Sequence, residues 1–224
     1  MILECHFLRK DFQRGSIGFT AVEDVDFSVA AGECITITGK SGSGKTTLVT
    51  MLAGLLTPTG GCVRYEGQDI YSLSDRALSL LRGRNIGFVP QGTSLLSSFT
   101  VVDNIRMSQA FCRDGSASAA ERAEFLLDAM GMSALSQAMP SSLSGGELRR
   151  VAIARALFHA PDVLLADEPT SDLDPENTQI VMAMLQNINT QGTALIVVTH
   201  EESVAAHGRK RFAMESGRLR AMVF

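Results

Sequence analysis

A glycine-rich turn between a predicted strand and a predicted helix constrains this chain more than any other feature. Over residues 33–38, Ile35 and Ile37 alternate with threonines, which is the period of a strand. The turn occupies residues 39–44, and residues 46–55 then have the composition of a helix. A strand that leads through glycines into a helix predicts a parallel α/β unit.

The turn also predicts a phosphate site. Residues 39–46 read G-K-S-G-S-G-K-T and fit the pattern G-x-x-x-x-G-K-[ST] in the strand–helix context that it requires. Glycines let backbone N–H groups form a nest for an anion, and the helix N-terminus adds its positive dipole end. Lys45 can reach the β- and γ-phosphates of a nucleotide, and the Thr46 hydroxyl can bind Mg²⁺. The alternative is a glycine-rich turn without a ligand. The nucleotide-binding residues expected here are Gly39, Lys40, Ser41, Gly42, Ser43, Gly44, Lys45, Thr46 and Thr47.

Strand and helix patterns alternate along the rest of the chain, apart from one helical stretch. Over residues 91–160 apolar residues recur with helical spacing, and residues 115–118 separate two segments of this stretch. We therefore predict a mainly parallel α/β core with a helical insertion. The other expected elements are strands at 2–8, 21–29, 62–65, 85–90, 163–166 and 194–199, a helix at 175–191, and a hairpin of 211–215 and 219–223.

Composition and charge exclude several classes of protein. Twenty Lys and Arg against 24 Asp and Glu give a net charge of −4, which leaves no broad basic surface for general nucleic-acid binding. The longest apolar run, residues 180–185, is far shorter than the roughly 20 residues of a bilayer span, and early charges leave no signal peptide. Cys5, Cys34, Cys62 and Cys112 have no metal-type or disulfide-type spacing, so we expect reduced thiols in a cytosolic protein.

Two acids follow a hydrophobic run at residues 163–166. A buried parallel strand delivers ligands at its carboxyl end, where α/β sheets bind. Asp167 is then positioned to hold Mg²⁺ through water, and Glu168 could accept a proton from a water that attacks a γ-phosphate. The alternative is that both are exposed turn acids before Pro169.

A second candidate anion site lies at residues 143–147, which read L-S-G-G-E before a helix expected at 148–159. Ser144, Gly145 and Gly146 would stand at a helix N-terminus, where backbone N–H groups bind anions. An ordinary serine cap is the alternative, but a cap does not need two consecutive glycines.

Taken together, these motifs resemble those of the ATP-binding subunits of ABC (ATP-binding cassette) transporters. Residues 39–46 resemble the Walker A motif, 143–147 the signature, 163–168 the Walker B strand with its catalytic glutamate, and 171–174 the D-loop. Gln91 resembles the Q-loop glutamine and His200 the switch histidine. The resemblance extends from Phe12, where the family presents an aromatic ring to adenine, to His200. A core phenylalanine is the alternative for Phe12.

The resemblance implies a single domain over residues 1–224 with a P-loop NTPase, RecA-like α/β core. Residues 1–91 and 160–224 would form this catalytic core with an N-terminal antiparallel β-subdomain, and 92–159 an inserted α-helical subdomain that carries the signature. It also implies a head-to-tail homodimer or heterodimer with two ATP molecules between the subunits. Each ATP, with Mg²⁺, would lie on the Walker A motif of one chain and meet Ser144 and Gly146 of the other.

Roles for individual residues follow from the same resemblance. Glu168 and His200 would be catalytic, and Thr46, Gln91 and Asp167 would hold Mg²⁺. The remaining residues expected at the nucleotide are Phe12, Ser144, Gly145, Gly146, Glu147 and Asp172. Glu147 departs from the commonest signature, which has Gln; the Glu form recurs in the lipoprotein-releasing, macrolide-efflux and division-associated branch.

The partner implied is an integral-membrane permease that holds the chain at the cytoplasmic face of the cell (inner) membrane; no nucleic acid is expected. Apolar residues within 92–99 could line a groove for a helix of that permease, or could pack the helical block. Export, extraction or mechanotransmission is favoured over uptake. The alternatives are an importer ATPase, a non-transport ABC-type ATPase and a small-molecule kinase.

Overall fold

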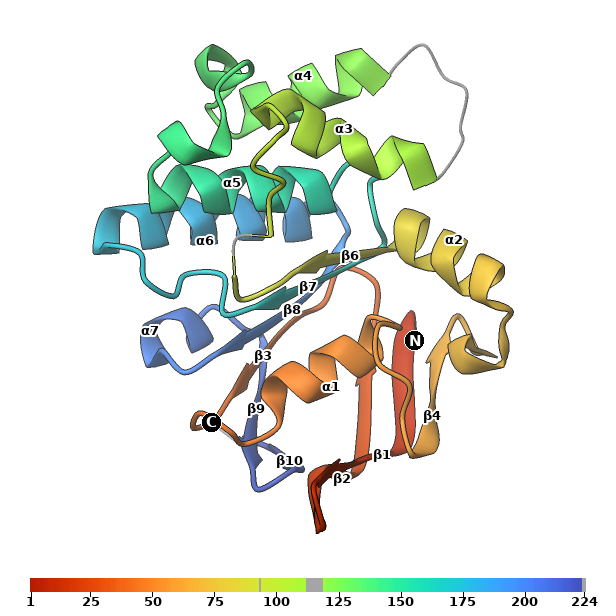
Figure 1. Cartoon of the computed structure of the whole chain (residues 1–224). Coiled ribbons are helices and arrows are strands. Elements are labelled where there is room, and N and C mark those ends of the chain that lie inside the picture. The colour runs from red at the N-terminus through yellow and green to blue at the C-terminus, as the bar shows by residue number, and fades with distance from the viewer. Residues whose placement is uncertain (93, 112–118, 223–224) are drawn as a thin grey trace.

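The computed structural model describes residues 1–92, 94–111 and 119–222, and it contains two β-sheets with helices packed between and around them (Figure 1). Cys112, the expected break at residues 115–118 and the end of the predicted hairpin at residue 223 lie outside the described residues.

A six-stranded sheet forms the centre of the molecule. Its strand order is β10-β9-β3-β8-β7-β6. Every pairing is parallel except the hairpin of β9 and β10, which confirms the mainly parallel core. All residues of β3, β7 and β8 are buried, as expected for parallel strands covered on both faces. The strands are β3 (Cys34–Thr38), β6 (Ile86–Val89), β7 (Val163–Asp167), β8 (Ala194–Thr199), β9 (Lys210–Glu215) and β10 (Arg218–Ala221).

An antiparallel sheet of order β2-β1-β4-β5 stands beside it. Its strands are β1 (Leu3–Arg14), β2 (Ile17–Val29), β4 (Gly60–Tyr65) and β5 (Gln68–Asp69). The first two strands are longer than the sequence pattern predicts, because polar residues interrupt the apolar alternation without interrupting the pairing. Asp11, for example, is paired with Thr20, whose hydroxyl donates to the Asp11 carboxylate at 2.7 Å.

Helices cover both faces of the six-stranded sheet (Figure 1). Helix α1 lies between the two sheets, α5 and α6 cover the opposite face, and α3 and α4 lie beyond α5. The helix bounds are α1 (Lys45–Leu52), α2 (Asp75–Asn85), α3 (Val101–Phe111), α4 (Ala119–Ala129), α5 (Gly145–Ala156), α6 (Pro175–Thr190) and α7 (Glu202–Ala205), with 3₁₀ turns at Ile70–Ser72, Ser133–Leu135 and Pro140–Ser142. No pattern in the sequence predicted α2 or α7.

The start of α5 corrects one prediction. The sequence placed this helix at residues 148–159, whereas it begins at Gly145. Ser144 caps it: the Ser144 hydroxyl accepts from the Glu147 N–H, and the Glu147 carboxylate accepts from the Ser144 N–H. This reciprocal capping box stabilises a helix start that two glycines would otherwise disfavour.

Two hydrophobic cores lie on opposite faces of the six-stranded sheet. Alternate residues of one strand enter different cores: Ile196 packs on the side of α1, while Leu195 and Val197 pack on the side of α5 and α6. The strands between them are therefore held from both sides, so that their carboxyl ends form a rigid edge for the site. Within the described residues the longest helix is α6, with 16 residues. None of these helices combines the length and apolar character needed to cross a bilayer.

Candidate nucleotide-binding site

The turn between β3 and α1 is pinned by backbone on two sides. Gly44 has φ 106°, and a Cβ there would overlap the Ala21 carbonyl oxygen of β2. At Gly39 a Cβ would overlap the Met214 carbonyl oxygen of β9. The Gly217 N–H of the C-terminal hairpin donates to the Ser43 carbonyl at 3.0 Å. These contacts require glycine at both positions and fix the loop against β2, β9 and the C-terminal hairpin.

Lys45 stands at the first position of α1 with its ammonium inside the loop. The residue is only 7% exposed. Its Nζ donates to the Gly39 carbonyl at 2.6 Å and to the Lys40 carbonyl at 3.1 Å, and lies 4.0 Å from Glu168 Oε1. The loop therefore presents a fixed positive charge, whereas Lys40 on the same loop is exposed.

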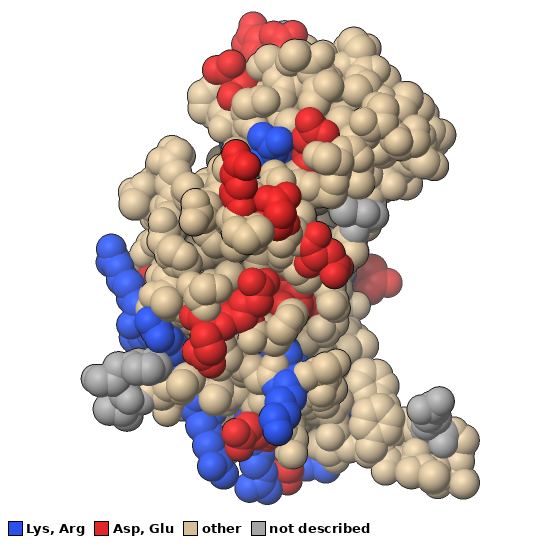
Figure 2. All heavy atoms as spheres, turned by 90° about the vertical axis from the view of Figure 1, so that its left-hand side faces the viewer, with Lys and Arg blue, Asp and Glu red and all other residues tan. Residues whose placement is uncertain are grey.

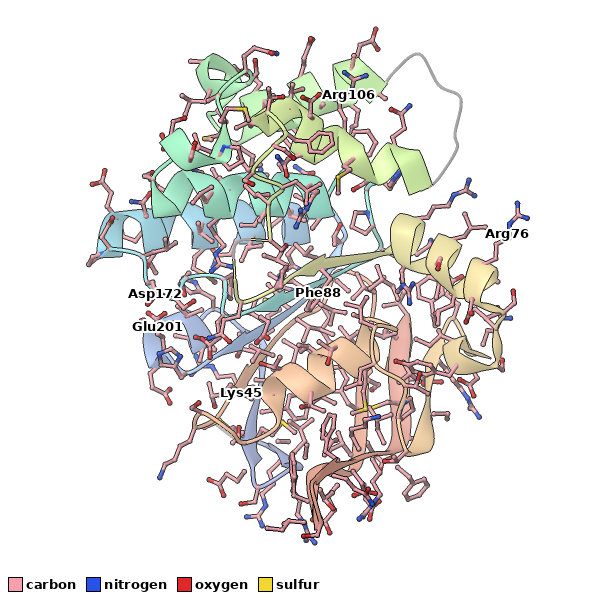
Figure 3. The ribbon with its side chains drawn as sticks, in the orientation of Figure 1. Lys45, Arg76, Phe88, Arg106, Asp172 and Glu201 are labelled. Carbon is pink, nitrogen blue, oxygen red and sulfur yellow. The ribbon has the colours of Figure 1, made fainter. Side chains whose placement is uncertain are left out.

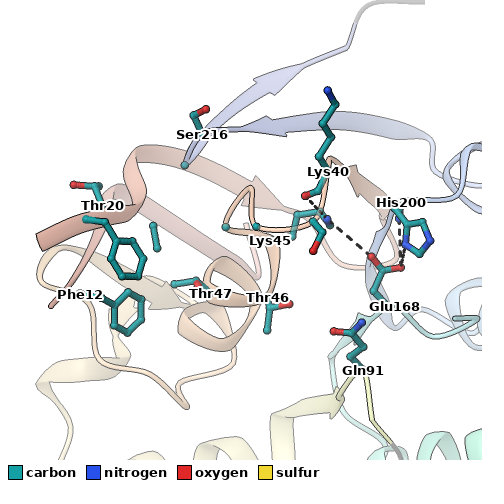
Figure 4. Close-up of a pocket in the computed structure, with 16 residues that line it drawn as sticks. Phe12, Thr20, Lys40, Lys45, Thr46, Thr47, Gln91, Glu168, His200 and Ser216 are labelled. Atoms are coloured by element: carbon teal, nitrogen blue, oxygen red, sulfur yellow. Dashed lines mark hydrogen bonds and ion pairs between the residues drawn. The ribbon is translucent and has the colours of Figure 1, made fainter. Parts of the chain in front are cut away.

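A cavity of about 740 Å³ opens over this loop (Figure 4). Its volume lies in the usual range of small-molecule sites. The lining combines residues from both sheets, α1 and the segment after β6. Of the expected site residues, the cavity brings together Phe12, Lys40, Ser41, Gly42, Gly44, Lys45, Thr46, Thr47, Gln91, Glu168 and His200. Gly39 and Ser43 line an adjoining cavity of about 790 Å³ on the side of the C-terminal hairpin.

The two acids at the end of β7 are buried rather than exposed turn residues. Asp167 is 1% exposed, and its Oδ1 has no hydrogen-bond partner among the described residues. Burial raises the pKa of Asp167, opposed by a hydrogen bond with the Thr46 side chain and by the charges of Lys45 and Arg149. An unpartnered buried carboxylate oxygen next to a hydroxyl is a site that a hydrated cation would complete.

Glu168 is held in a strained backbone conformation that aims its side chain into the cavity. Its φ is 49°, its N–H donates to the Val198 carbonyl at 2.8 Å, and it is 5% exposed. The carboxylate Oε2 lies 2.9 Å from His200 Nδ1 and accepts from the His200 N–H at 3.3 Å. A left-handed non-glycine residue costs about 1–3 kcal/mol and is concentrated at functional sites. The side chain of Gln91 lies on the same side of the cavity (Figure 4).

Two aromatic rings, rather than one, stand at the far end of the cavity from Glu168. Phe12 and Phe19 face each other across the β1–β2 hairpin with ring centroids 5.6 Å apart at an interplanar angle of 26°. Lys10 Nζ lies 5.3 Å from the Phe12 centroid. The sequence reasoning missed Phe19. The Gly15-Ser16 dipeptide between two strand patterns was the available signal, because a two-residue turn there pairs Phe12 with Phe19.

Six expected site residues line neither of these two cavities: the buried Asp167, and Ser144, Gly145, Gly146, Glu147 and Asp172. Ser144 is exposed, and its hydroxyl donates to Glu147 Oε2 at 2.8 Å. Gly146 is buried, and a Cβ there would overlap the side chain of Asn177 at the start of α6. The two anion sites expected from the sequence are therefore separate within one chain.

Acidic side chains gather on the face shown in Figure 2, in a band that crosses the middle of the molecule. Asp172 and Glu201 lie on this side of the molecule, as does Lys45 at the start of α1 (Figure 3). The exposed acids of the loop before α6, of its first turn and of the start of α7 are Asp172, Asp174, Glu176 and Glu202. The Lys45 ammonium is thus a buried positive charge beside an acidic surface.

The fold and this cavity define a P-loop nucleotide-binding protein. A family model described as ABC transporter matches residues 22–171. Among solved structures, the dimeric structure of MJ0796, a bacterial ABC transporter cassette, is 32% identical with a TM-score of 0.92 and covers 98% of this chain and 97% of that one. The dimeric post-hydrolysis state of the MJ0796 cassette bound to ADP and Pi is 31% identical, also with a TM-score of 0.92, and the coverage is again 98% and 97%. A nucleotide-free ATP-binding cassette from an ABC transporter, 24% identical with a TM-score of 0.83, covers 97% of this chain and 89% of that one and is similar in fold.

The chain belongs to the ABC transporter family, as an ATP-binding cassette. Its α/β core with an antiparallel β-sheet and a helical block matches the fold of these cassettes and confirms the predicted fold class.

Proposed function

We propose that this chain is the ATP-hydrolysing subunit of an ABC transporter and that it drives a separate membrane permease. The observation that carries this proposal is that Lys45, Glu168 and His200 line one cavity. One oxygen of the Glu168 carboxylate lies 4.0 Å from Lys45 Nζ, and the other lies 2.9 Å from His200 Nδ1. A phosphate-binding lysine would need no buried carboxylate beside it for binding alone, because the carboxylate repels a phosphate.

Within this proposal, Lys45 and the N–H groups of the loop hold the β- and γ-phosphates, and Phe12 with Phe19 stacks on adenine. Glu168 is the general base for the attacking water. His200, which contacts Glu168 and lines the same cavity, orients that carboxylate and contacts the γ-phosphate. These roles are supported by the cavity that the side chains of Phe12, Lys45, Glu168 and His200 line together.

The residues present fit a bound Mg²⁺. The described residues contain no group of three or more His, Cys, Asp and Glu side chains placed to hold a metal. Mg²⁺ at a nucleotide site, however, needs only one or two protein oxygens beside phosphates and water. The Thr46 hydroxyl, the Gln91 side chain and the unpartnered Asp167 Oδ1 provide them. The ion would neutralise charge on the phosphates.

The signature acts, in our proposal, on the nucleotide of a second chain. Ser144 is exposed at the N-terminus of α5 and does not line the cavity over the Lys45 loop of the same chain. The MJ0796 cassette is dimeric. Two chains packed head to tail would each supply Ser144, Gly145, Gly146 and Asp172 to the ATP on the other. Hydrolysis would remove the bridging γ-phosphate and reopen the pair.

The permease would dock on the helical subdomain, residues 92–159, at the cytoplasmic face of the membrane. Leu96 and Phe99 are exposed in the segment after Gln91, while Leu95 packs against the core on the side of α5 and α6. An exposed apolar pair next to a nucleotide-sensing loop fits a helix of the partner. The Glu at position 147 supports the lipoprotein-releasing, macrolide-efflux and division-associated branch, and hence export, extraction or mechanotransmission.

The central test is Glu168→Gln, with Glu124→Gln as a matched control, because Glu124 is exposed on α4 and lines neither cavity. The Glu168 variant should lose about 10²–10⁴-fold in ATP turnover and should trap a dimer with ATP in size-exclusion chromatography. The control should keep wild-type turnover. Hydrolysis at the wild-type rate by the Glu168 variant would contradict the proposal.

A second experiment addresses the shared site. Ser144→Arg places a long cation where the γ-phosphate of the second chain's ATP would lie, so hydrolysis should be abolished while ATP binding is retained. Ser142→Arg, at an exposed serine two residues earlier, is the control. Wild-type turnover by the Ser144 variant would sink the shared-site model.

A third experiment addresses the permease. The chain should sediment with membranes only when a partner permease is co-expressed, and Phe99→Glu should weaken this retention. Phe125→Glu, at an exposed phenylalanine on α4, should leave it unchanged. Retention without any permease would overturn this part of the proposal.

A further inference from the structure

A buried arginine joins the signature helix to the segment that carries Gln91. Arg149 lies on α5, five positions after Ser144, and is only 4% exposed. Its Nη1 donates to the Pro90 carbonyl at 2.8 Å, and its Nη2 donates to the Gln91 carbonyl at 2.8 Å. One guanidinium thus grips two consecutive peptide groups just after β6.

This arrangement is costly to build, since it buries a cation without a close carboxylate. No described ion pair within 4.0 Å includes Arg149, and its Nε has no hydrogen-bond partner among the described residues. Burial lowers the pKa of Arg149, and the charges of Asp172 and Asp167 oppose this shift. Packing alone would be served as well by an apolar side chain of similar volume. The buried charge therefore calls for another explanation.

The two carbonyls identify what the guanidinium controls. Gln91 has its backbone held by Arg149 while its side chain lines the nucleotide cavity. Arg149 lies on the helix that Ser144 caps, so both residues belong to one continuous element. A displacement of the signature end of α5 would therefore act, through Arg149, on the peptide group of Gln91.

Arg155, on the same helix, shows what a merely structural contact would look like. Its Nη1 donates to the Ser94 carbonyl at 2.8 Å, and its Nη2 donates to Ser94 Oγ at 2.6 Å. Burial also lowers the pKa of this guanidinium. Arg155 thus tethers the same segment three residues beyond Gln91, at a residue that does not line the cavity.

We propose that Arg149 is a positioning residue that couples the position of the signature helix to the placement of Gln91 in the nucleotide cavity. The inference rests on the proposed function in one respect, namely the assignment of Gln91 to bound Mg²⁺–ATP.

The test compares Arg149→Lys with Arg155→Lys in the full chain, since lysine keeps the charge but cannot span two carbonyls. Arg149→Lys should raise the Mg²⁺ concentration for half-maximal ATPase activity about tenfold or more, while ATP binding in EDTA stays within about twofold. Arg155→Lys should leave both within about twofold. Equal effects of the two substitutions would overturn the proposal.

A double-mutant cycle adds a readout that a structural role would not move. In a Gln91→Ala background, Arg149→Lys should cause no further loss of activity, because its effect passes through Gln91. Additive losses would contradict the proposal. Should Arg149→Lys fail to fold, Arg149→Gln, which removes the buried charge and keeps an amide donor, takes its place in the cycle.

Amide hydrogen exchange separates this proposal from the proposed function. Exchange at Gln91 and Gly92 should become faster in Arg149→Lys and stay unchanged in Arg155→Lys, whether or not the wild type hydrolyses ATP. A wild type without ATPase activity would refute the proposed function alone. Unchanged exchange at Gln91 in Arg149→Lys would refute the coupling alone.

Discussion

His200 makes two contacts with one oxygen of Glu168: the Glu168 Oε2 atom lies 2.9 Å from His200 Nδ1 and 3.3 Å from the His200 backbone nitrogen. The histidine directly follows β8 and the glutamate directly follows β7, and these strands are neighbours in the sheet. The carboxylate is thereby fixed by a parallel pair of strands that both cores hold. A base that is oriented in this way needs little reorganisation before it acts.

His200→Ala should therefore lower the ATPase rate constant by a larger factor than it weakens ATP binding. Without the ring, the Glu168 carboxylate keeps only the backbone contact with His200 and can rotate further towards Lys45. We expect kcat to fall about 10²-fold, the low end of the range for a general base. Steady-state kinetics and nucleotide binding on the same preparations check this. His207→Ala, at an exposed histidine of the same segment, is the control; an equal loss there would exclude a specific role.

The sequence predicted those parts of the site whose side chains and backbone N–H groups come from residues adjacent in the chain. The loop at residues 39–44 and its lysine follow a strand and open a helix, so local spacing is sufficient. The acids after β7 were predictable for the same reason. The start of α5 was missed because glycines disfavour helices. The available local signal was the S-x-x-E spacing of Ser144 and Glu147, which form the capping box that offsets this cost.

Residues that reach the site through long-range pairing escaped prediction. Phe19 depends on the register of the β1–β2 hairpin, and Gly217 depends on how the C-terminal hairpin packs on the loop. Arg149 reads as one more polar residue on a helix, yet it is buried by the segment after β6. Sheet register and helix packing are set by contacts between segments distant in sequence, which local periodicity does not contain.

Gly44→Ala should destabilise the fold far more than Gly42→Ala. Both glycines have positive φ, 106° and 78°, so both substitutions introduce backbone strain of about 1 kcal/mol. A Cβ at Gly44 also overlaps the Ala21 carbonyl, whereas nothing lies within 4 Å of one at Gly42. We expect the Gly44 variant to lose about 3 kcal/mol of unfolding free energy. Urea denaturation measures both midpoints, and equal shifts would show that the loop can move away from β2.

Phe12 and Phe19 should contribute jointly to nucleotide affinity. Removing a stacking ring costs about 1–3 kcal/mol per base, so Phe12→Ala should weaken ATP binding by that amount. Because the rings contact each other, the double alanine variant should depart from additivity by about 0.5–1.5 kcal/mol. Fluorescent-nucleotide titration of the four proteins in this cycle gives the coupling. Strict additivity, or an equal effect of Phe125→Ala on distant α4, would remove Phe19 from the site.

Glu147 should make the stability of the chain depend on acid pH. The N–H and hydroxyl of Ser144 donate to its carboxylate at 2.7 and 2.8 Å and hold the pKa of Glu147 below its ordinary value of 4.5. A carboxyl with a lower pKa in the folded state contributes stability that is complete above the unfolded value. That contribution is lost as the pH falls below 4.5 and through the folded value.

Glu147→Gln keeps an oxygen that can accept both hydrogen bonds but does not titrate, so it isolates the charge from the cap. Between pH 7 and pH 3 the urea midpoint of the variant should fall less than that of the wild type. Glu124→Gln, at an exposed glutamate of α4, should follow the wild type.

Glu147→Gln also removes a negative charge next to the Ser144 hydroxyl, where the second chain's γ-phosphate is proposed to bind. The ATP-dependent dimer of a Glu168→Gln background should therefore become tighter in size-exclusion chromatography at low salt. An unchanged dimer with an altered acid profile would confine Glu147 to capping the helix.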